Sequence, residues 1–151
     1  MRVHICGIHE LVALDRFDAI VSINDPGDAL PPEVALADAP VLPLWFHDAC
    51  ADDEEVVFPE AWHLRRVRDF VMRTRPQQLL VHCTAGISRS SAVALFALSA
   101  AHPVWSDVRV VQAVLDARPE ALPNALIVQL ADDATGRDLG GALRMCLPGW
   151  H

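Results

Sequence analysis

The residues whose types and spacing best suit chemistry form one continuous run, His82-Cys83-Thr84-Ala85-Gly86-Ile87-Ser88-Arg89-Ser90. An apolar strand is predicted to lead into the run, over 79–82, and a strongly apolar helix to follow it, over 91–101. Backbone N–H groups converge where a strand, a tight loop and a helix N-terminus meet, and the positive end of the helix dipole favours an anion there. The same groups favour thiolate over thiol, so Cys83 is predicted to be a nucleophile.

The spacing within the run suits a phosphoryl group. Five residues separate Cys83 from Arg89, which lets the backbone turn once around a tetrahedral anion and returns the arginine beside the sulfur. The guanidinium of Arg89 can bind two phosphoryl oxygens at once. The loop amides can bind the non-bridging oxygens, where negative charge gathers in the transition state. The predicted phosphate-binding residues are therefore Thr84, Ala85, Gly86, Ile87, Ser88 and Arg89.

Two neighbours complete the predicted chemistry of the loop. Ser90 is small and polar, so it can hydrogen-bond the sulfur of Cys83 and ease its departure from a phospho-cysteine. His82 is expected to orient the loop through its ring nitrogens rather than to act as a base. The alternative is a buried, inert cysteine at a strand end. That alternative leaves Arg89 and Ser90 unexplained, and the pattern arises by chance in about one such chain in a thousand.

The run HCTAGISRS resembles the signature loop of the cysteine-dependent protein tyrosine phosphatases. Its small AGxSRS form is most similar to the dual-specificity branch and its bacterial relatives. The similarity covers about two-thirds of the chain, from Val41 through the acidic loop and a long helix to Arg118-Pro119 and Pro123-Asn124. The resemblance implies that Cys83 is the nucleophile, that Arg89 binds phosphate, that Ser90 assists hydrolysis of the phospho-enzyme, and that no metal or other cofactor is needed.

The same resemblance implies an aspartic acid on an upstream loop that protonates the leaving group. Asp48 lies just after the third predicted strand and 35 residues before Cys83, which resembles the position of that acid. Asp52 and Asp53 remain alternatives, although the acidic run that contains them is typical of a solvated loop. An acid that must be protonated while Cys83 is ionised implies a bell-shaped rate profile with an acidic optimum.

Two further residues have open roles. Asn124 follows Pro123 and matches a family position that helps to fix the loop network, but it could equally be the N-cap of a helix over 124–134. Cys50 lies two residues beyond Asp48 and could form a disulfide with Cys83 under oxidation.

Composition limits the remaining possibilities. The 151 residues, 52% of them hydrophobic, suit a single phosphatase domain over 1–151. A net charge of −8 argues against a nucleic-acid partner. The cysteines and histidines lack the spacing of a zinc site, so no metal is expected. The chain has no apolar run of membrane-spanning length and no signal peptide, so a cytoplasmic, reduced protein is predicted, and a monomer is favoured.

The elements that position the loop alternate between strand and helix. Strands are predicted over 3–7, 19–23, 41–45 and 79–82, the third at an edge because it contains Pro43. Helical segments are predicted over 10–15, 33–37, 59–73, 91–101, 107–117 and 124–134, with Pro59 in the first turn of the long helix and Ser106 as a cap. The fold class is α/β with three layers, in which helices flank a mostly parallel sheet of four to five strands. The tail over 136–151 is ambiguous.

The leading functional hypothesis is a phosphomonoester hydrolase that acts on phosphotyrosine or on phosphoserine and phosphothreonine in proteins. The alternatives are a phosphatase of a phosphoinositide, inositol phosphate or other small ester, and a phosphate-recognition module without turnover. The uncharged loop residues Thr84, Ala85, Ile87 and Ser88 argue against a polyanionic substrate. The intact Cys83, Arg89 and Ser90 argue against a module.

Overall fold

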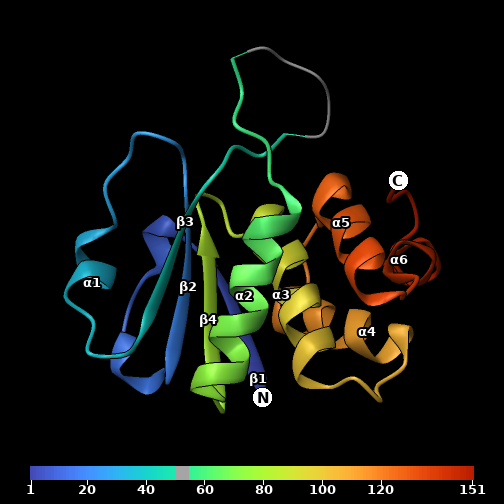
Figure 1. The fold of residues 1–151 in the computed structure, drawn as a ribbon, viewed down its shortest axis with the longest axis horizontal. Helices are drawn as coiled ribbons and strands as arrows, with labels where there is room; N and C mark the ends of the chain where they lie inside the picture. Colours follow the sequence, from blue (N-terminus) through green and yellow to red (C-terminus); the bar gives the residue numbers. More distant parts are fainter. Residues whose placement is uncertain (50–54) are drawn as a thin grey trace.

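The computed structural model describes residues 1–49 and 55–151, and their centre is a parallel sheet (Figure 1). The four strands of this part of the chain are β1 (Arg2–Gly7), β2 (Ala19–Asn24), β3 (Val41–Trp45) and β4 (Gln78–Cys83). Their spatial order is β1-β4-β2-β3, so β4 is a central strand with a neighbour on each side. Because β3 is an edge strand, Pro43 costs no ladder hydrogen bond on its open side.

Alternate residues of the strands enter two separate apolar clusters, as the pleat of a strand requires. One face buries residues such as Ile5, Val21 and Val81 in the main core. The other face buries Ile20 and Leu80 in a smaller cluster. Both faces are therefore covered, which explains why the strands are almost continuously apolar.

Five helices pack against the main core, and they make up most of the chain after residue 60. They are α2 (Ala61–Thr74), α3 (Arg89–Ala101), α4 (Asp107–Ala117), α5 (Ala125–Thr135) and α6 (Leu139–Cys146). Helix α3 is buried nearly all round and contacts α2, α4 and α5 as well as two strands. The helix that begins at Arg89 is thus fixed on every side (Figure 1).

The second face of the sheet has a much thinner cover. It consists of two 3₁₀ turns, η1 (Ile8–Glu10) and η2 (Leu14–Arg16), and the four-residue helix α1 (Pro32–Ala35). The predicted α/β fold with a parallel sheet and flanking helices is confirmed, with four strands in the described residues. The third layer, however, is built mainly of short turns rather than of long helices.

Several predicted boundaries differ from the observed ones. The long helix begins at Ala61 with Glu60 as its N-cap, so the expectation that Pro59 occupies its first turn is wrong. The turn expected over 10–15 is split into η1 and η2. The ambiguous tail contains the helix α6, whose apolar residues Leu139 and Leu143 enter the main core. Ser106 caps α4 as expected, because its hydroxyl accepts from the Arg109 amide at 3.1 Å.

None of the helices in the described ranges has the length and apolarity needed to cross a bilayer.

Candidate active site

The candidate site lies at the carboxyl ends of the parallel strands, where open α/β sheets commonly bind ligands. Strand β4 ends at Cys83, and α3 begins at Arg89, so residues 84–88 form a short loop between a central strand and a buried helix. Asp25 follows β2, and Asp48 follows β3. The sheet therefore brings residues from three separate parts of the chain to one edge (Figure 1).

The sulfur of Cys83 is buried within this loop. The Gly86 amide donates to Cys83 Sγ at 3.2 Å, and the Ser90 hydroxyl lies 3.1 Å from the same atom. The cysteine is only 3% exposed. One backbone amide and one hydroxyl thus lie within hydrogen-bond distance of a buried sulfur.

The backbone of the loop turns tightly against the end of β1. Gly86 has a φ of +73°, and a Cβ added there would overlap the backbone of Cys6 and Gly7. A Cβ added at Gly7 would in turn lie 2.8 Å from the carbonyl oxygens of Thr84 and Ala85. The Ile8 amide also donates to the Thr84 carbonyl at 3.0 Å. Both glycines are required for this close approach, since no side chain fits between β1 and the loop.

Arg89 is held from two sides. Its Nη1 donates to Asp25 Oδ1 at 2.7 Å and to the Phe46 carbonyl at 2.8 Å. Its Nη2 donates to the Thr84 hydroxyl at 3.0 Å, so this edge of the guanidinium faces the loop. The side chain is 6% exposed, and the ion pair with Asp25 stabilises a positive charge that burial alone would penalise.

Asp48 reaches the loop from β3. Its Oδ1 accepts from the Ser88 hydroxyl at 2.7 Å and from Asn124 Nδ2 at 2.8 Å. Asn124 also caps α5, because its Oδ1 accepts from the Ile127 amide at 3.0 Å. The N-cap expected for Asn124 is confirmed, and the contact with Asp48 is present beside it, while its role in the loop network stays a prediction. One side chain joins the start of α5 to the carboxylate.

His82 is buried on the opposite face of the sheet from Cys83. Its Nε2 lies 2.6 Å from Ser22 Oγ, and Nδ1 lies 3.3 Å from the Cys83 carbonyl. Asn24 donates to the same serine hydroxyl at 3.1 Å. Burial lowers the pKa of His82 below its usual value and so favours the neutral ring. The ring is thus a fixed part of the strand end that carries Cys83.

The back of the loop is supported by an ion pair. Arg118 binds both carboxylate oxygens of Glu10, at 2.8 and 2.9 Å, and also donates to the Ala85 carbonyl at 3.3 Å. Glu10 accepts from the Gly7 amide at 2.9 Å as well. Hydrogen bonding from Arg118 lowers the pKa of Glu10 to about 2. The pair therefore stays ionised at any ordinary pH.

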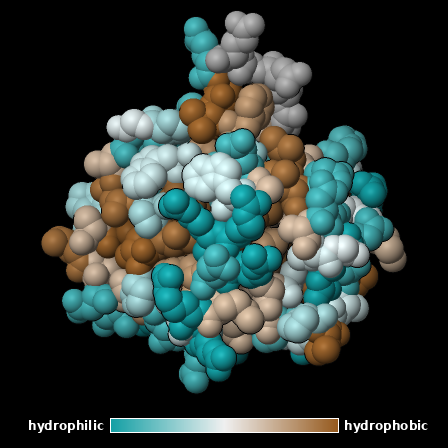
Figure 2. All heavy atoms as spheres, in the orientation of Figure 1, coloured by the Kyte–Doolittle hydropathy of each residue, from teal (hydrophilic) through white to brown (hydrophobic). Residues whose placement is uncertain are grey.

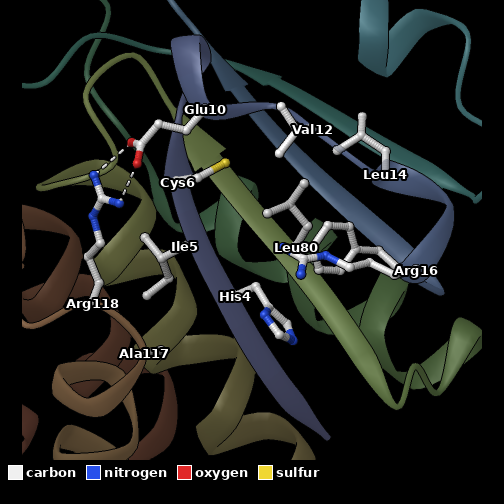
Figure 3. Close-up of a pocket in the computed structure, with 11 residues that line it drawn as sticks. His4, Ile5, Cys6, Glu10, Val12, Leu14, Arg16, Leu80, Ala117 and Arg118 are labelled. Atoms are coloured by element: carbon white, nitrogen blue, oxygen red, sulfur yellow. Dashed lines mark hydrogen bonds and ion pairs between the residues drawn. The ribbon is translucent and has the colours of Figure 1, made fainter.

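A cavity of about 280 Å³ lies beside this ion pair, on the face of the sheet that carries η1 and η2 (Figure 3). Cys6 and Leu80 contribute to its lining, together with Glu10 and Arg118. Burial raises the pKa of the Cys6 thiol to about 11. The second thiol near the loop is consequently protonated near neutral pH and is no nucleophile.

Sequence reasoning found the residues of the loop but missed those that hold it. Asp25, Ser22, Asn24, Glu10 and Arg118 contact the loop or its neighbours, yet none of them was assigned a role. The turn formers around Asp25 indicated only a loop. Cys50, Asp52 and Asp53 lie outside the described residues, so the predicted disulfide and the alternative acids stay predictions. Within the described ranges, no group of three or more acidic, histidine or cysteine side chains is arranged to hold a metal ion.

Comparison with solved structures identifies the architecture. Tk-PTP in its active form matches 91% of this chain and 93% of its own, with a TM-score of 0.64 and 21% identity. Human DUSP28 matches 89% and 91%, with a TM-score of 0.65 and 22% identity. The fold is that of the cysteine-dependent protein tyrosine phosphatases.

The same fold also occurs in a solved structure that contains a phosphoinositide. PTPMT1 in complex with PI(5)P matches 89% of this chain and 90% of its own, with a TM-score of 0.64 and 19% identity. No family model and no curated protein sequence matches the chain. The likeness therefore lies in the three-dimensional structure, and the chemistry must be argued from the residues of the site.

Proposed function

We propose that this protein is a metal-independent phosphomonoester hydrolase of the protein tyrosine or dual-specificity type, and that it acts through a phospho-cysteine. One observation carries the proposal: Cys83, Arg89 and Asp48 converge on a single loop of 84–88. The sulfur receives an amide hydrogen bond, the guanidinium faces the loop, and the carboxylate is held by Ser88 at the loop's end. These are the three groups that thiolate displacement at phosphorus requires.

In the first step the Cys83 thiolate attacks phosphorus, and the bond from phosphorus to the ester oxygen breaks. The leaving oxygen takes a proton from the Asp48 carboxyl as the bond breaks. The amides of 84–88 and the guanidinium of Arg89 bind the three non-bridging oxygens, where charge is spread in the transition state. The products of this step are the alcohol or phenol and a phospho-cysteine.

In the second step water attacks the phospho-cysteine. The Asp48 carboxylate, now deprotonated, accepts a proton from that water, and sulfur leaves as the thiolate. Ser90 lies 3.1 Å from the sulfur, so its hydroxyl can donate to the departing thiolate. Phosphate is released, and the enzyme returns to its starting state.

The proposed substrate is a phosphorylated protein, with phosphotyrosine or phosphoserine and phosphothreonine as the reacting residue. Between Cys83 and Arg89 the loop contains only uncharged residues. It can therefore bind one phosphate through its amides, but it has no charged side chain for a second phosphate. A thiolate nucleophile also suits a reduced, cytoplasmic setting. The likeness to PTPMT1 in complex with PI(5)P keeps a phosphoinositide as the competing substrate class.

Hydrolysis of a small aryl phosphate tests the proposed function. We expect hydrolysis that vanadate inhibits, that chelators leave unchanged, and that Cys83→Ser abolishes. Cys146→Ser is the matched control, because Cys146 lies on α6. The proposal fails if the wild-type protein binds phosphate but hydrolyses nothing between pH 5 and 8, or if Cys83→Ser stays active.

A further inference from the structure

The charge around the loop of residues 84–88, the proposed phosphate loop, is unusual for a site that must attract an anion. Among the described residues, the segments at or near this edge of the molecule are 8–10, 25–30, 46–49, 55–60, 84–89 and 118–124. They contain two arginines and seven acidic residues, namely Glu10, Asp25, Asp28, Asp48, Glu55, Glu60 and Glu120. The chain contains no lysine. Asp48 carries its proton when the substrate binds in the proposed mechanism, so six acidic side chains and two basic ones supply the charge of these segments.

Both arginines of this edge are already ion-paired. Arg118 binds Glu10 through two oxygens and lies 3.0 Å from a carboxylate oxygen of Glu120. Arg89 binds Asp25 at 2.7 Å. Arg89 can meet one phosphate with the edge that faces the loop, but Arg118 has two carboxylate partners and is 14% exposed. A substrate with a second phosphate would find no free cation among these segments.

Asp25 brings negative charge directly to the mouth of the site. Its Oδ1 contacts Nη1 of Arg89, while Nη2 of the same guanidinium contacts Thr84 in the phosphate loop. The Asp25 side chain is 43% exposed, so its carboxylate stays open to solvent one guanidinium away from the bound phosphate. A cation on the substrate can approach it there.

The remaining cations lie elsewhere on the molecule. Helix α2 exposes four arginines, Arg65, Arg66, Arg68 and Arg73. The helix itself runs away from the end of β4, where the loop of 84–88 begins (Figure 1). Figure 2 shows hydrophilic side chains gathered over this helix. The molecule is thus acidic at the site and basic along one helix, and the field around the site favours cationic groups next to the bound phosphate.

We infer that the substrate is a phosphopeptide segment with lysine or arginine close to the phosphorylated residue. This inference rests on the proposed function and names the substrate class of the same site. The phosphate binds in the loop, and the flanking cations of the peptide face Asp25 and the acidic residues around it. Complementary charge of this kind contributes mainly to selectivity and to the rate of encounter. A polyphosphorylated inositol places further negative charge where the protein is already negative.

The test is a comparison of two phosphotyrosine peptides that differ only in their flanking residues, lysine and arginine in one and glutamate in the other. The measured quantity is the ratio of their kcat/KM values for the same protein preparation. We expect a ratio of at least about tenfold in favour of the basic peptide at low salt, and a smaller ratio at high salt because salt screens exposed charges.

Asp25→Asn links the preference to this side chain. Asparagine keeps an oxygen that can accept from Arg89, but it removes the charge. The ratio should fall about fivefold, as expected for one charge pair near a protein surface. Because the ratio compares two substrates of one variant, a general loss of activity cancels. Asp69→Asn makes the same change on α2, where the side chain is 71% exposed, and should leave the ratio unchanged.

Three outcomes would overturn the inference. Equal rates for the two peptides, an unchanged ratio in Asp25→Asn, or a polyphosphorylated inositol that outcompetes the basic peptide would each contradict it. If a small aryl phosphate is still hydrolysed in a manner that depends on Cys83, the proposed function survives that failure. If no phosphate ester is hydrolysed, both proposals fail.

Discussion

At the scale of single residues, Asp48 is the side chain whose geometry constrains the chemistry most. Its Oδ1 accepts two hydrogen bonds, from Ser88 in the phosphate loop and from Asn124 at the start of α5. In the proposed mechanism this carboxyl group gives a proton and later takes one back, so it needs a fixed position relative to phosphorus. Ser88 and Asn124 hold the carboxylate in place even when no substrate is bound.

Asp48→Asn should retain those contacts, because the asparagine oxygen can accept from the same donors. We expect kcat for a phosphotyrosine substrate to fall about 10²–10⁴-fold, the usual contribution of a general acid. The limb of the rate profile that reports the acid should disappear. Steady-state kinetics between pH 5 and 8 provide the measurement.

Asp38→Asn, at an exposed site beyond α1, is the matched control and should behave as wild type. An unchanged pH dependence of kcat in Asp48→Asn would show that another carboxylate is the general acid.

The residue scale also separates what sequence can predict from what it cannot. Cys83, Arg89 and Ser90 lie within eight consecutive positions, so their spacing alone predicted a shared loop. Asp25 contacts Arg89 across 64 positions, and Glu10 meets Arg118 across 108. Such pairs depend on strand order and register, which no local pattern encodes.

At the scale of elements, the fit between β1 and the phosphate loop determines the loop's shape. The end of β1 lies against Gly86, and the pair of Glu10 with Arg118 holds the same region from behind. The sequence predicted β1 as a strand from its apolar residues. Its support of the loop could not be predicted, because that role depends on β1 being the neighbour of β4.

Gly86→Ala tests the close contact between the loop and the end of β1, and Gly136→Ala is its matched control. Gly136 also has a positive φ, +71°, but a Cβ there meets no atom within 4 Å. Gly136→Ala should cost only the left-handed backbone energy, about 1–2 kcal/mol, and leave kcat/KM unchanged. Gly86→Ala carries the same backbone cost plus overlap with β1, so it should lose more stability and at least about tenfold in kcat/KM. Urea unfolding and aryl phosphate kinetics measure both, and equal effects in the two variants would contradict the assignment.

Asn124 joins the start of α5 to Asp48 in the loop after β3. Substitution can separate its contact with the Ile127 amide from its contact with Asp48. Serine is as good an N-cap as asparagine but too short to span both partners. Asn124→Ser should therefore keep the free energy of unfolding within about 0.5 kcal/mol of wild type. It should lower kcat about tenfold for a substrate with a poor leaving group, because Asp48 loses one of its two donors.

Asn124→Ala should lose both the capping energy, about 1 kcal/mol, and the rate. Full activity in Asn124→Ser would show that the contact with Asp48 has no catalytic role.

At the scale of the whole molecule, buried histidines couple stability to pH. Burial lowers the pKa of His82 from its ordinary value of 6.5, and it does the same for His63 and His102. A lowered folded-state pKa means that the unfolded chain binds the proton more readily. The stabilising contribution is therefore complete above pH 6.5 and is lost as the pH falls below that value.

His82→Gln should have a lower Tm than wild type near neutral pH, because Ser22 loses its imidazole partner. Its Tm should also decline less between about pH 7 and about pH 5. In the wild type all three histidines contribute to the decline of Tm as the pH falls. In the variant only His63 and His102 contribute to it. Identical slopes would contradict a neutral, buried His82.

The layered α/β architecture followed from the alternation of apolar strands and amphipathic helices, and a parallel sheet of four strands was found. The short elements over the second face were predicted as helical segments over 10–15 and 33–37, but their place on that face was not predicted. The burial of Leu14 and Val34 depends on the face of the sheet that they meet rather than on periodicity.

The central claim is that Cys83 carries the phosphoryl group between the two chemical steps. The direct measurement is mass spectrometry of the protein quenched in acid during turnover of an aryl phosphate. We predict a mass gain of one phosphoryl group on the peptide that contains Cys83. It should accumulate further in Ser90→Ala, because the departing thiolate loses its hydroxyl donor, and be absent in Cys83→Ser. Turnover without any phosphorylated Cys83, in the wild type and in Ser90→Ala alike, would contradict the account.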